Sequence, residues 1–135
     1  MSYEMSKETR KKLIEMLDSR EYETEPYECT NEVLLRALCL SIGINKTDSM
    51  ICICYEILQR HGYNKNDFVN KIYEERIRQE ELHPYNEKTC YELILIEEYG
   101  EAVKAYNELD ENGMIDELIQ FVAVKVRIME IDDYI

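Results

Sequence analysis

The 135-residue chain is 45% hydrophobic, which is enough apolar material for one domain with a core and excludes a disordered acidic tail. Its formal net charge of −13 argues against nucleic-acid polymers as partners, because phosphate contacts need clustered Lys and Arg. No stretch approaches the roughly 18 apolar residues of a membrane span, and the first residues lack the apolar run of a signal peptide.

The five cysteines, an odd number, predict reduced thiols in a cytoplasmic protein. Cys39, Cys52, Cys54 and Cys90 fall within apolar or helical runs and are expected in the core. A shared metal site at Cys52 and Cys54 is not expected, because residues two apart on a helix point about 200° away from each other.

Gly and Pro are scarce, at four and two residues, which favours long helices with short connections. We predict that Ser6, Thr30, Asp48 and Asn66 are the N-caps of the first four helices. The apolar run from Val33 to Leu40 is expected to pack on the core or on another subunit. The sequence therefore predicts an all-α antiparallel bundle of about five or six helices. The predicted helices cover about 7–18, 31–41, 49–60, 67–82, 87–109 and 114–131.

The last two predicted helices, joined by a polar turn at Asp110–Gly113, place carboxylates where apolar side chains are expected. At 100° per residue, Glu98 falls inside the apolar arc of the fifth helix and Glu101 at its edge. On the sixth helix, Glu117 shares a face with apolar residues, and Gln120 lies beside it. Three inward carboxylates on an antiparallel helix pair can share a divalent cation, and Mg²⁺ prefers oxygen ligands. The alternative is that these are solvated edge positions, since 29 of the 135 residues are acidic.

The string Glu97-Glu98-Tyr99-Gly100-Glu101-Ala102 resembles the EExGE signature of the MazG-like all-α nucleotide pyrophosphohydrolases. That family pairs an ExxE on one helix with an ExxD on the next. Here Glu98 and Glu101 form the first pair, and Glu117 begins the second after 15 intervening residues.

Two further runs extend this resemblance to about residues 70–131. The run 116–124 is similar to the EELvQvAAVAV variant of the family, and 75–79 is similar to its ERxRQ helix. Gln120 stands where the family pattern has Asp, and a neutral ligand there predicts weaker metal binding.

The resemblance implies Mg²⁺-dependent hydrolysis of a nucleoside triphosphate to a nucleoside monophosphate and pyrophosphate. It implies that Glu98, Glu101 and Glu117, with Gln120, hold Mg²⁺, and that Glu97 takes the proton of the attacking water. It also implies a dimer or tetramer. A homo-oligomer is expected on separate grounds, because the fifth helix is apolar on nearly every side.

Cations and an amide near the acidic site are candidates for substrate binding. Lys104 is equally well placed for ion pairs with Glu101 and Glu108, and Gln79 for a role as a capped core amide. Tyr99 and Tyr106 share a face and either stack on a base or pack in the core. The candidate substrate-binding residues are Arg76, Arg78, Gln79, Lys104 and Arg127.

Residues 1–65 lie outside the resemblance and are expected to form an N-terminal helical extension that packs on a 66–135 helical domain. The alternative function comes from another class: a non-catalytic helical protein that sequesters a nucleotide or inhibits a protein partner. Gln120, the high negative charge and the unexplained first half of the chain favour that alternative.

Overall fold

The computed structural model describes residues 3–18, 30–82 and 88–132, and every regular element within these ranges is a helix. The predicted all-α class is therefore confirmed for the described residues, and each predicted helix end lies within one helical turn of the observed one. The elements are α1 (Lys7–Asp18), α2 (Asn31–Gly43), α3 (Thr47–Arg60), α4 (Lys65–Leu82), α5 (Lys88–Asn107) and α6 (Glu111–Ile131).

Two of the four predicted N-caps are confirmed. The Ser6 hydroxyl accepts a hydrogen bond from the Thr9 backbone N–H at 3.0 Å, at the start of α1. The Thr30 hydroxyl accepts one from the Val33 N–H at 3.2 Å, at the start of α2. Each bond satisfies a backbone donor that has no partner inside the helix.

The other two predicted caps are wrong, because α3 and α4 each begin earlier. The N-cap of α3 is Lys46, and among the described residues no side chain caps that end. At α4, the Asn64 side chain accepts from the Asp67 N–H at 2.8 Å, and the Asp67 carboxylate accepts from the Asn64 N–H at 3.1 Å. This reciprocal pair starts the helix before Asn66.

The connection between α5 and α6 also begins earlier than predicted. Leu109 adopts a left-handed backbone with a φ of 59°, which ends α5 and reverses the chain. The Asp110 carboxylate accepts a hydrogen bond from the Gly113 N–H at 3.0 Å, so Asp110 is the N-cap of α6. The predicted turn at Asp110–Gly113 is therefore the first turn of a helix.

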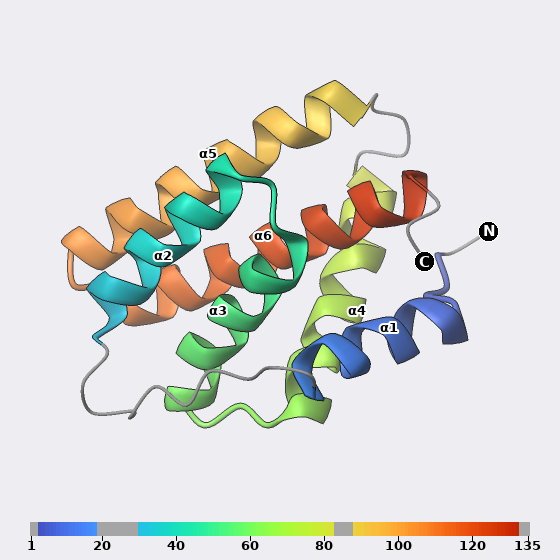
Figure 1. The fold of residues 1–135 in the computed structure, drawn as a ribbon, viewed down its shortest axis with the longest axis horizontal. Helices are drawn as coiled ribbons and strands as arrows, with labels where there is room; N and C mark the ends of the chain where they lie inside the picture. The colour runs from blue at the N-terminus through green and yellow to red at the C-terminus, as the bar shows by residue number, and fades with distance from the viewer. Residues whose placement is uncertain (1–2, 19–29, 83–87, 133–135) are drawn as a thin grey trace.

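Helix α6 lies at the centre of the bundle (Figure 1). Helices α3, α4 and α5 pack against it, with α5 making the most extensive contact as its antiparallel partner. Helix α2 packs on α3, and α1 packs on α3 and α4. One core cluster draws side chains from all six helices, so residues on both sides of position 65 share it. Its members include Leu13, Leu38, Ile57, Phe68, Ala102 and Phe121.

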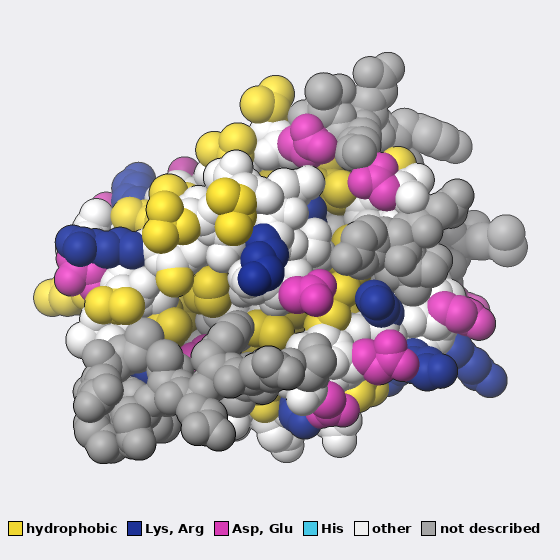
Figure 2. Space-filling model, in the orientation of Figure 1, with side chains coloured by type: hydrophobic (Ala, Val, Ile, Leu, Met, Phe, Trp, Pro, Cys, Tyr) yellow, Lys and Arg dark blue, Asp and Glu magenta, His cyan; other side chains and the backbone are white. Residues whose placement is uncertain are grey.

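The apolar run of α2 is only partly covered. Leu34, Leu35 and Leu38 are buried, whereas Val33 and Leu40 are exposed, Leu40 at 72%. On α5, Leu93 and Ile96 are exposed as well, and Figure 2 shows hydrophobic side chains gathered over both helices. The core-facing side of the run from Val33 to Leu40 therefore packs on the core, as expected, and packing of its exposed side chains on another subunit stays a prediction. Across the described ranges, no helix has the length and apolar character needed to cross a membrane.

The described cysteines are free thiols, as predicted, but they do not all lie in the core. Cys52 and Cys54 are buried on α3, and burial raises the pKa of the Cys54 thiol well above its usual range. Cys39 is exposed on α2, so its predicted core position is wrong, because it faces away from the side on which Leu38 packs. Cys29 and the Cys90 side chain lie outside the described part of the chain.

Candidate functional site

A cavity of about 300 Å³ lies between α4, α5 and α6. This volume is at the small end of the range for ligand pockets, roughly 300–1,000 Å³. Apolar groups of Tyr91, Ile94 and Val124 form one part of its wall, and polar groups form the rest. Seven of the ten predicted site residues lie in that wall: Arg76, Arg78, Gln79, Glu97, Glu98, Gln120 and Arg127.

Helical periodicity explains why residues distant in sequence share this wall. On α5, Tyr91, Ile94 and Glu98 are spaced i, i+3, i+7, so they form one stripe along the helix. On α6, Gln120, Val124 and Arg127 are spaced i, i+4, i+7. Because α5 and α6 are antiparallel neighbours, the two stripes face a common space that α4 closes.

The carboxyl groups of Glu98 and Glu117 meet beside this cavity. The pKa of Glu98 is raised to about 8. Burial is the largest cause, followed by the hydrogen bond and the negative charge of Glu117 and then by the charges of Glu97 and Glu75. One oxygen of Glu117, Oε2, is buried and meets no N–H or O–H donor among the described residues. The raised pKa favours the protonated form of Glu98, which has an O–H group to donate to the Glu117 carboxylate.

Glu75 on α4 is a site residue that the sequence analysis did not select. Its charge acts on Glu98, and its carboxylate binds the Arg78 guanidinium in two places, with Nη2–Oε1 at 2.6 Å and Nε–Oε2 at 2.9 Å. The hydrogen bond to Glu75 raises the pKa of Arg78, and the charges of Glu98 and Glu117 act in the same direction. The sequence feature that could have identified Glu75 is its position as the first residue of the 75–79 run, three residues before Arg78.

Gln79 joins α4 to α6. Its side-chain amide donates to the Gln120 backbone carbonyl at 3.3 Å and lies 3.5 Å from a Glu75 oxygen. The structure thus gives Gln79 the bonding of a core amide, and it leaves the Gln120 side chain in the cavity wall. A substrate-binding role for Gln79 stays a prediction.

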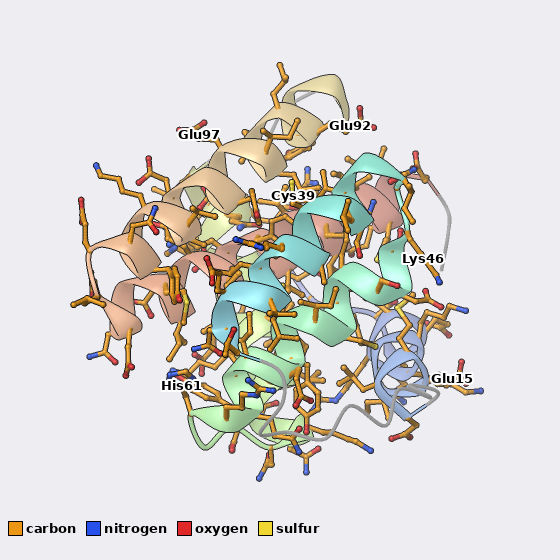
Figure 3. The ribbon with its side chains drawn as sticks, turned by 60° about the vertical axis from the view of Figure 1, so that its left-hand side comes forward. Glu15, Cys39, Lys46, His61, Glu92 and Glu97 are labelled. Atoms are coloured by element: carbon orange, nitrogen blue, oxygen red, sulfur yellow. The ribbon has the colours of Figure 1, made fainter. Side chains whose placement is uncertain are left out.

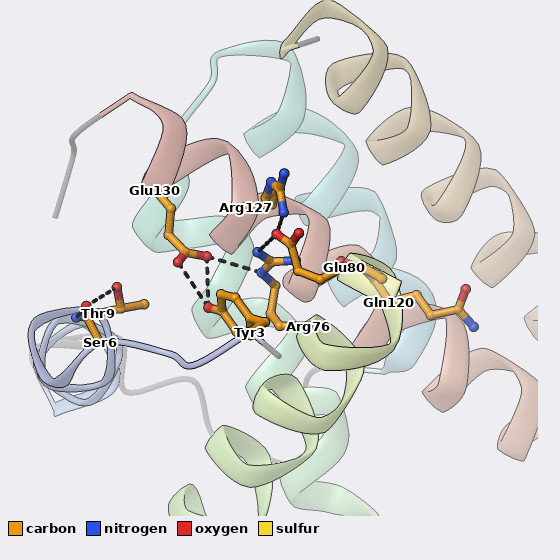
Figure 4. A network of polar contacts seen from close by, with 9 residues as sticks. Tyr3, Ser6, Thr9, Arg76, Glu80, Gln120, Arg127 and Glu130 are labelled. Atoms are coloured by element: carbon orange, nitrogen blue, oxygen red, sulfur yellow. Dashed lines mark hydrogen bonds and ion pairs between the residues drawn. The ribbon is translucent and has the colours of Figure 1, made fainter. Parts of the chain in front are cut away.

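Arg76 and Arg127, both in the cavity wall, belong to a network of charged side chains (Figure 4). Arg76 is only 1% exposed, and its guanidinium donates to Glu130 at 3.1 Å and to Glu80 at 2.8 Å. Arg127 also pairs with Glu80. Tyr3 donates to Glu130 at 3.0 Å and lies under the Arg76 guanidinium. Both arginines therefore already have carboxylate partners, and a role in binding substrate stays a prediction.

Glu101 and Lys104 do not join the other predicted residues. Both are exposed on α5 and lie outside the cavity wall. Among the described residues, no group of three or more His, Cys, Asp and Glu side chains is placed to hold a metal ion. The predicted convergence of Glu98, Glu101 and Glu117 is thus not found, because Glu101 is turned about 60° from Glu98 around the helix and faces solvent.

The remaining predicted groups lie at the edge of the site or away from it. Glu97 is exposed at the cavity rim and projects from the outer side of α5 (Figure 3). Tyr99 donates its hydroxyl to the Leu35 carbonyl at 2.8 Å, which ties α5 to α2. Tyr106 is half-buried and lines a different, smaller cavity. The tyrosine in the wall of the cavity between α4, α5 and α6 is Tyr91, which is not among the predicted site residues.

The chain matches no protein-family model, no curated protein and no solved structure. The resemblance to the MazG-like pyrophosphohydrolases therefore rests on the short strings of α4, α5 and α6 alone.

Proposed function

We propose that this chain is a Mg²⁺-dependent nucleoside triphosphate pyrophosphohydrolase that releases a nucleoside monophosphate and pyrophosphate. The observation that supports it best is the pairing of Glu98 with Glu117 beside a cavity lined by Arg78 and two amide side chains. Two carboxylates held together at the edge of a cavity are the oxygen ligands that such chemistry requires.

The residues present fit a hard divalent cation. Mg²⁺ in proteins is commonly held by one or two carboxylates together with substrate phosphates and waters, so Glu98 and Glu117 suffice. The buried Oε2 of Glu117 accepts from no N–H group or hydroxyl of the described residues, and a cation would relieve the repulsion between the two carboxylates when both are ionised. Gln120, one turn from Glu117, offers a neutral oxygen. When bound, the ion would supply charge stabilisation at the phosphate oxygens.

The chain's own residues supply the other requirements. Glu97, exposed at the rim, takes the proton of the attacking water. Arg78 exchanges its Glu75 partner for a phosphate oxygen, which its planar guanidinium binds in the same two-point manner. Ile94 and Val124 limit the access of water from the apolar side.

The proposal includes a homo-oligomer, a dimer or a tetramer. The exposed apolar side chains of α2 and α5 support it, because Leu93 and Ile96 are 68% and 55% exposed in the single chain. Large apolar side chains grouped on one surface are typical of protein–protein contacts.

The decisive test is pyrophosphate release from a panel of canonical and damaged nucleoside triphosphates in the presence of Mg²⁺. Glu98→Gln should lower kcat/KM by about a hundredfold or more, because it removes one carboxylate of the pair. Glu92→Gln, at an exposed position of the same helix, is the matched control and should retain the parent's activity. Equal activity of Glu98→Gln and the parent would show that the pair is structural.

The alternative is a non-catalytic nucleotide-binding or inhibitory protein. The internal pairing of Arg76, Arg78 and Arg127 with carboxylates favours it, as does the neutral Gln120. Nucleotide binding by the parent without any metal-dependent turnover, measured by calorimetry and pyrophosphate release on one sample, would favour this alternative.

A further inference from the structure

Tyr91 differs from the other tyrosines described above in the surroundings of its hydroxyl. Its side chain is only 6% exposed, and its hydroxyl has no hydrogen-bond partner among the described residues. Two other tyrosines show the usual arrangement, since Tyr3 bonds to Glu130 and Tyr99 to the Leu35 carbonyl. Buried hydroxyls are nearly always paired because an unpaired one destabilises the fold. The exception at Tyr91 therefore calls for an explanation.

The position of Tyr91 supplies that explanation. It forms part of the cavity wall on the same stripe of α5 as Ile94 and Glu98. Glu98 follows Tyr91 by seven positions, which places the two residues about 10 Å apart along the helix axis. Across the cavity lies Val124, and the Arg127 guanidinium lies over the Tyr91 ring, 5.2 Å from its centroid. The cavity thus has a carboxylate end and, about 10 Å along α5, an apolar end with one hydroxyl.

Building on the proposed function, we propose that Tyr91 recognises the base of the nucleotide through its hydroxyl. A phenol both donates and accepts hydrogen bonds, so it suits the carbonyl and ring-nitrogen edge of a heterocyclic base. The Tyr91 ring, Ile94 and Val124 provide the flat apolar surroundings that such a ring prefers. The spacing to Glu98 leaves room for the sugar between the base and the reacting phosphate.

The hydroxyl oxygen has almost no exposed surface, so the base reaches it when a wall side chain moves. Arg127 is placed for this role, because its long side chain lies over the Tyr91 ring. Rotamer changes of this size are common when a ligand binds.

The test compares Tyr91→Phe with Tyr99→Phe. Each variant loses one hydroxyl from α5, but only the Tyr99 hydroxyl has an internal partner. Titrations with the common nucleosides, followed by NMR, should show Tyr91→Phe weakening the best-bound nucleoside by about two- to tenfold. Its thermal midpoint should stay equal to that of the parent or rise. Tyr99→Phe should show the reverse, a lower midpoint with unchanged nucleoside affinity.

Activity separates this proposal from the function on which it builds. Inorganic triphosphate, which has no base, should be hydrolysed equally by the parent and Tyr91→Phe, while kcat/KM for the nucleotide falls. Nucleotide hydrolysis with identical base preference in both proteins would overturn the role of Tyr91 and leave the function standing. Tyr91-dependent nucleoside binding without turnover would overturn the function and support the role of Tyr91. A parent that binds no nucleoside, or a Tyr91→Phe variant that loses stability at unchanged affinity, overturns the role of Tyr91.

Discussion

The Glu98 carboxyl keeps its proton near neutral pH because burial and the adjacent Glu117 carboxylate both disfavour its charge. A carboxyl pKa of about 8 in the folded chain, against 4.5 when exposed, means that the folded state binds more protons between these values. The stability contributed by this group is therefore complete below about pH 4.5 and is lost as the pH rises to about 8.

This linkage gives a prediction for the metal-free protein. Glu98→Gln keeps the neutral form at every pH, so its thermal midpoint should exceed that of the parent at pH 8 by a few degrees and converge with it toward pH 5. The facing charges are Glu97 on α5, Glu117 on α6, and Glu75 and Arg78 on α4. Glu92→Gln should follow the parent across the range. A constant gap between Glu98→Gln and the parent from pH 5 to pH 8 would contradict the raised pKa.

A second prediction at the residue scale concerns Gln120. Its side chain lines the cavity one turn from Glu117 and contributes no charge. Gln120→Asp should bind Mg²⁺ about tenfold more tightly, because ligand charge sets affinity for hard cations. The same change adds a further negative charge beside Glu98, so the metal-free variant should be slightly less stable than the parent. Calorimetry with Mg²⁺ and thermal unfolding with a chelator measure the two effects. Unchanged Mg²⁺ affinity would show that the side chain at position 120 is not part of the metal site.

Periodicity predicted some of these residues and missed others. Glu98 and Glu117 were predicted to face inward because whole turns of apolar neighbours flank them, and the structure brings the two together. Glu101 was misplaced because a position at the edge of the apolar arc turns to solvent when the neighbouring helix does not reach it. The roles of Glu75 and of the Tyr91 hydroxyl, which has no partner in the described part of the chain, depend on contacts between helices, and a helical wheel does not contain these.

At the scale of elements, hydrophobic periodicity located all six described helices, whereas composition alone did not fix their first residues. The first residue of each helix depends on which polar side chain caps the first turn, as the reciprocal hydrogen bonds between Asn64 and Asp67 show. The junction of α5 and α6 depends on Asp110 in the same way. This junction also sets the register between the cavity-facing residues of α5 and those of α6.

Two glycines provide a test of that junction. A Cβ added at Gly113 would lie 2.3 Å from Asp110 Oδ2, so Gly113→Ala must displace the capping carboxylate. A Cβ at Gly100, in the middle of α5, meets nothing within 4 Å. Gly100→Ala should therefore stabilise the fold by up to about 1 kcal/mol through helix propensity alone. Gly113→Ala should lose that gain, because a lost cap costs about 1 kcal/mol. Urea unfolding of both variants measures the difference, and an equal gain at the two positions would show that the cap contributes nothing.

At the scale of the whole molecule, one chain covers its central helix but not its α2 and α5 surfaces. Helix α6 is packed by three neighbours, whereas α5 has α6 on one side and exposed leucine and isoleucine on another. The predicted need for burial was correct for the core-facing half of α2.

We expect the chain to form a homo-oligomer through this surface, and Leu93→Glu or Ile96→Glu to produce monomers. Burying one such side chain contributes about 2 kcal/mol, and a two-fold interface buries both copies, so one substitution removes about 4 kcal/mol per dimer. That loss raises the dimer Kd roughly a thousandfold. Leu109→Glu is the matched control, since Leu109 is exposed in the turn between α5 and α6. Light scattering at micromolar concentration decides the point: a monomeric parent, or a Leu109→Glu variant that dissociates as readily as Leu93→Glu, would refute an interface at Leu93 and Ile96.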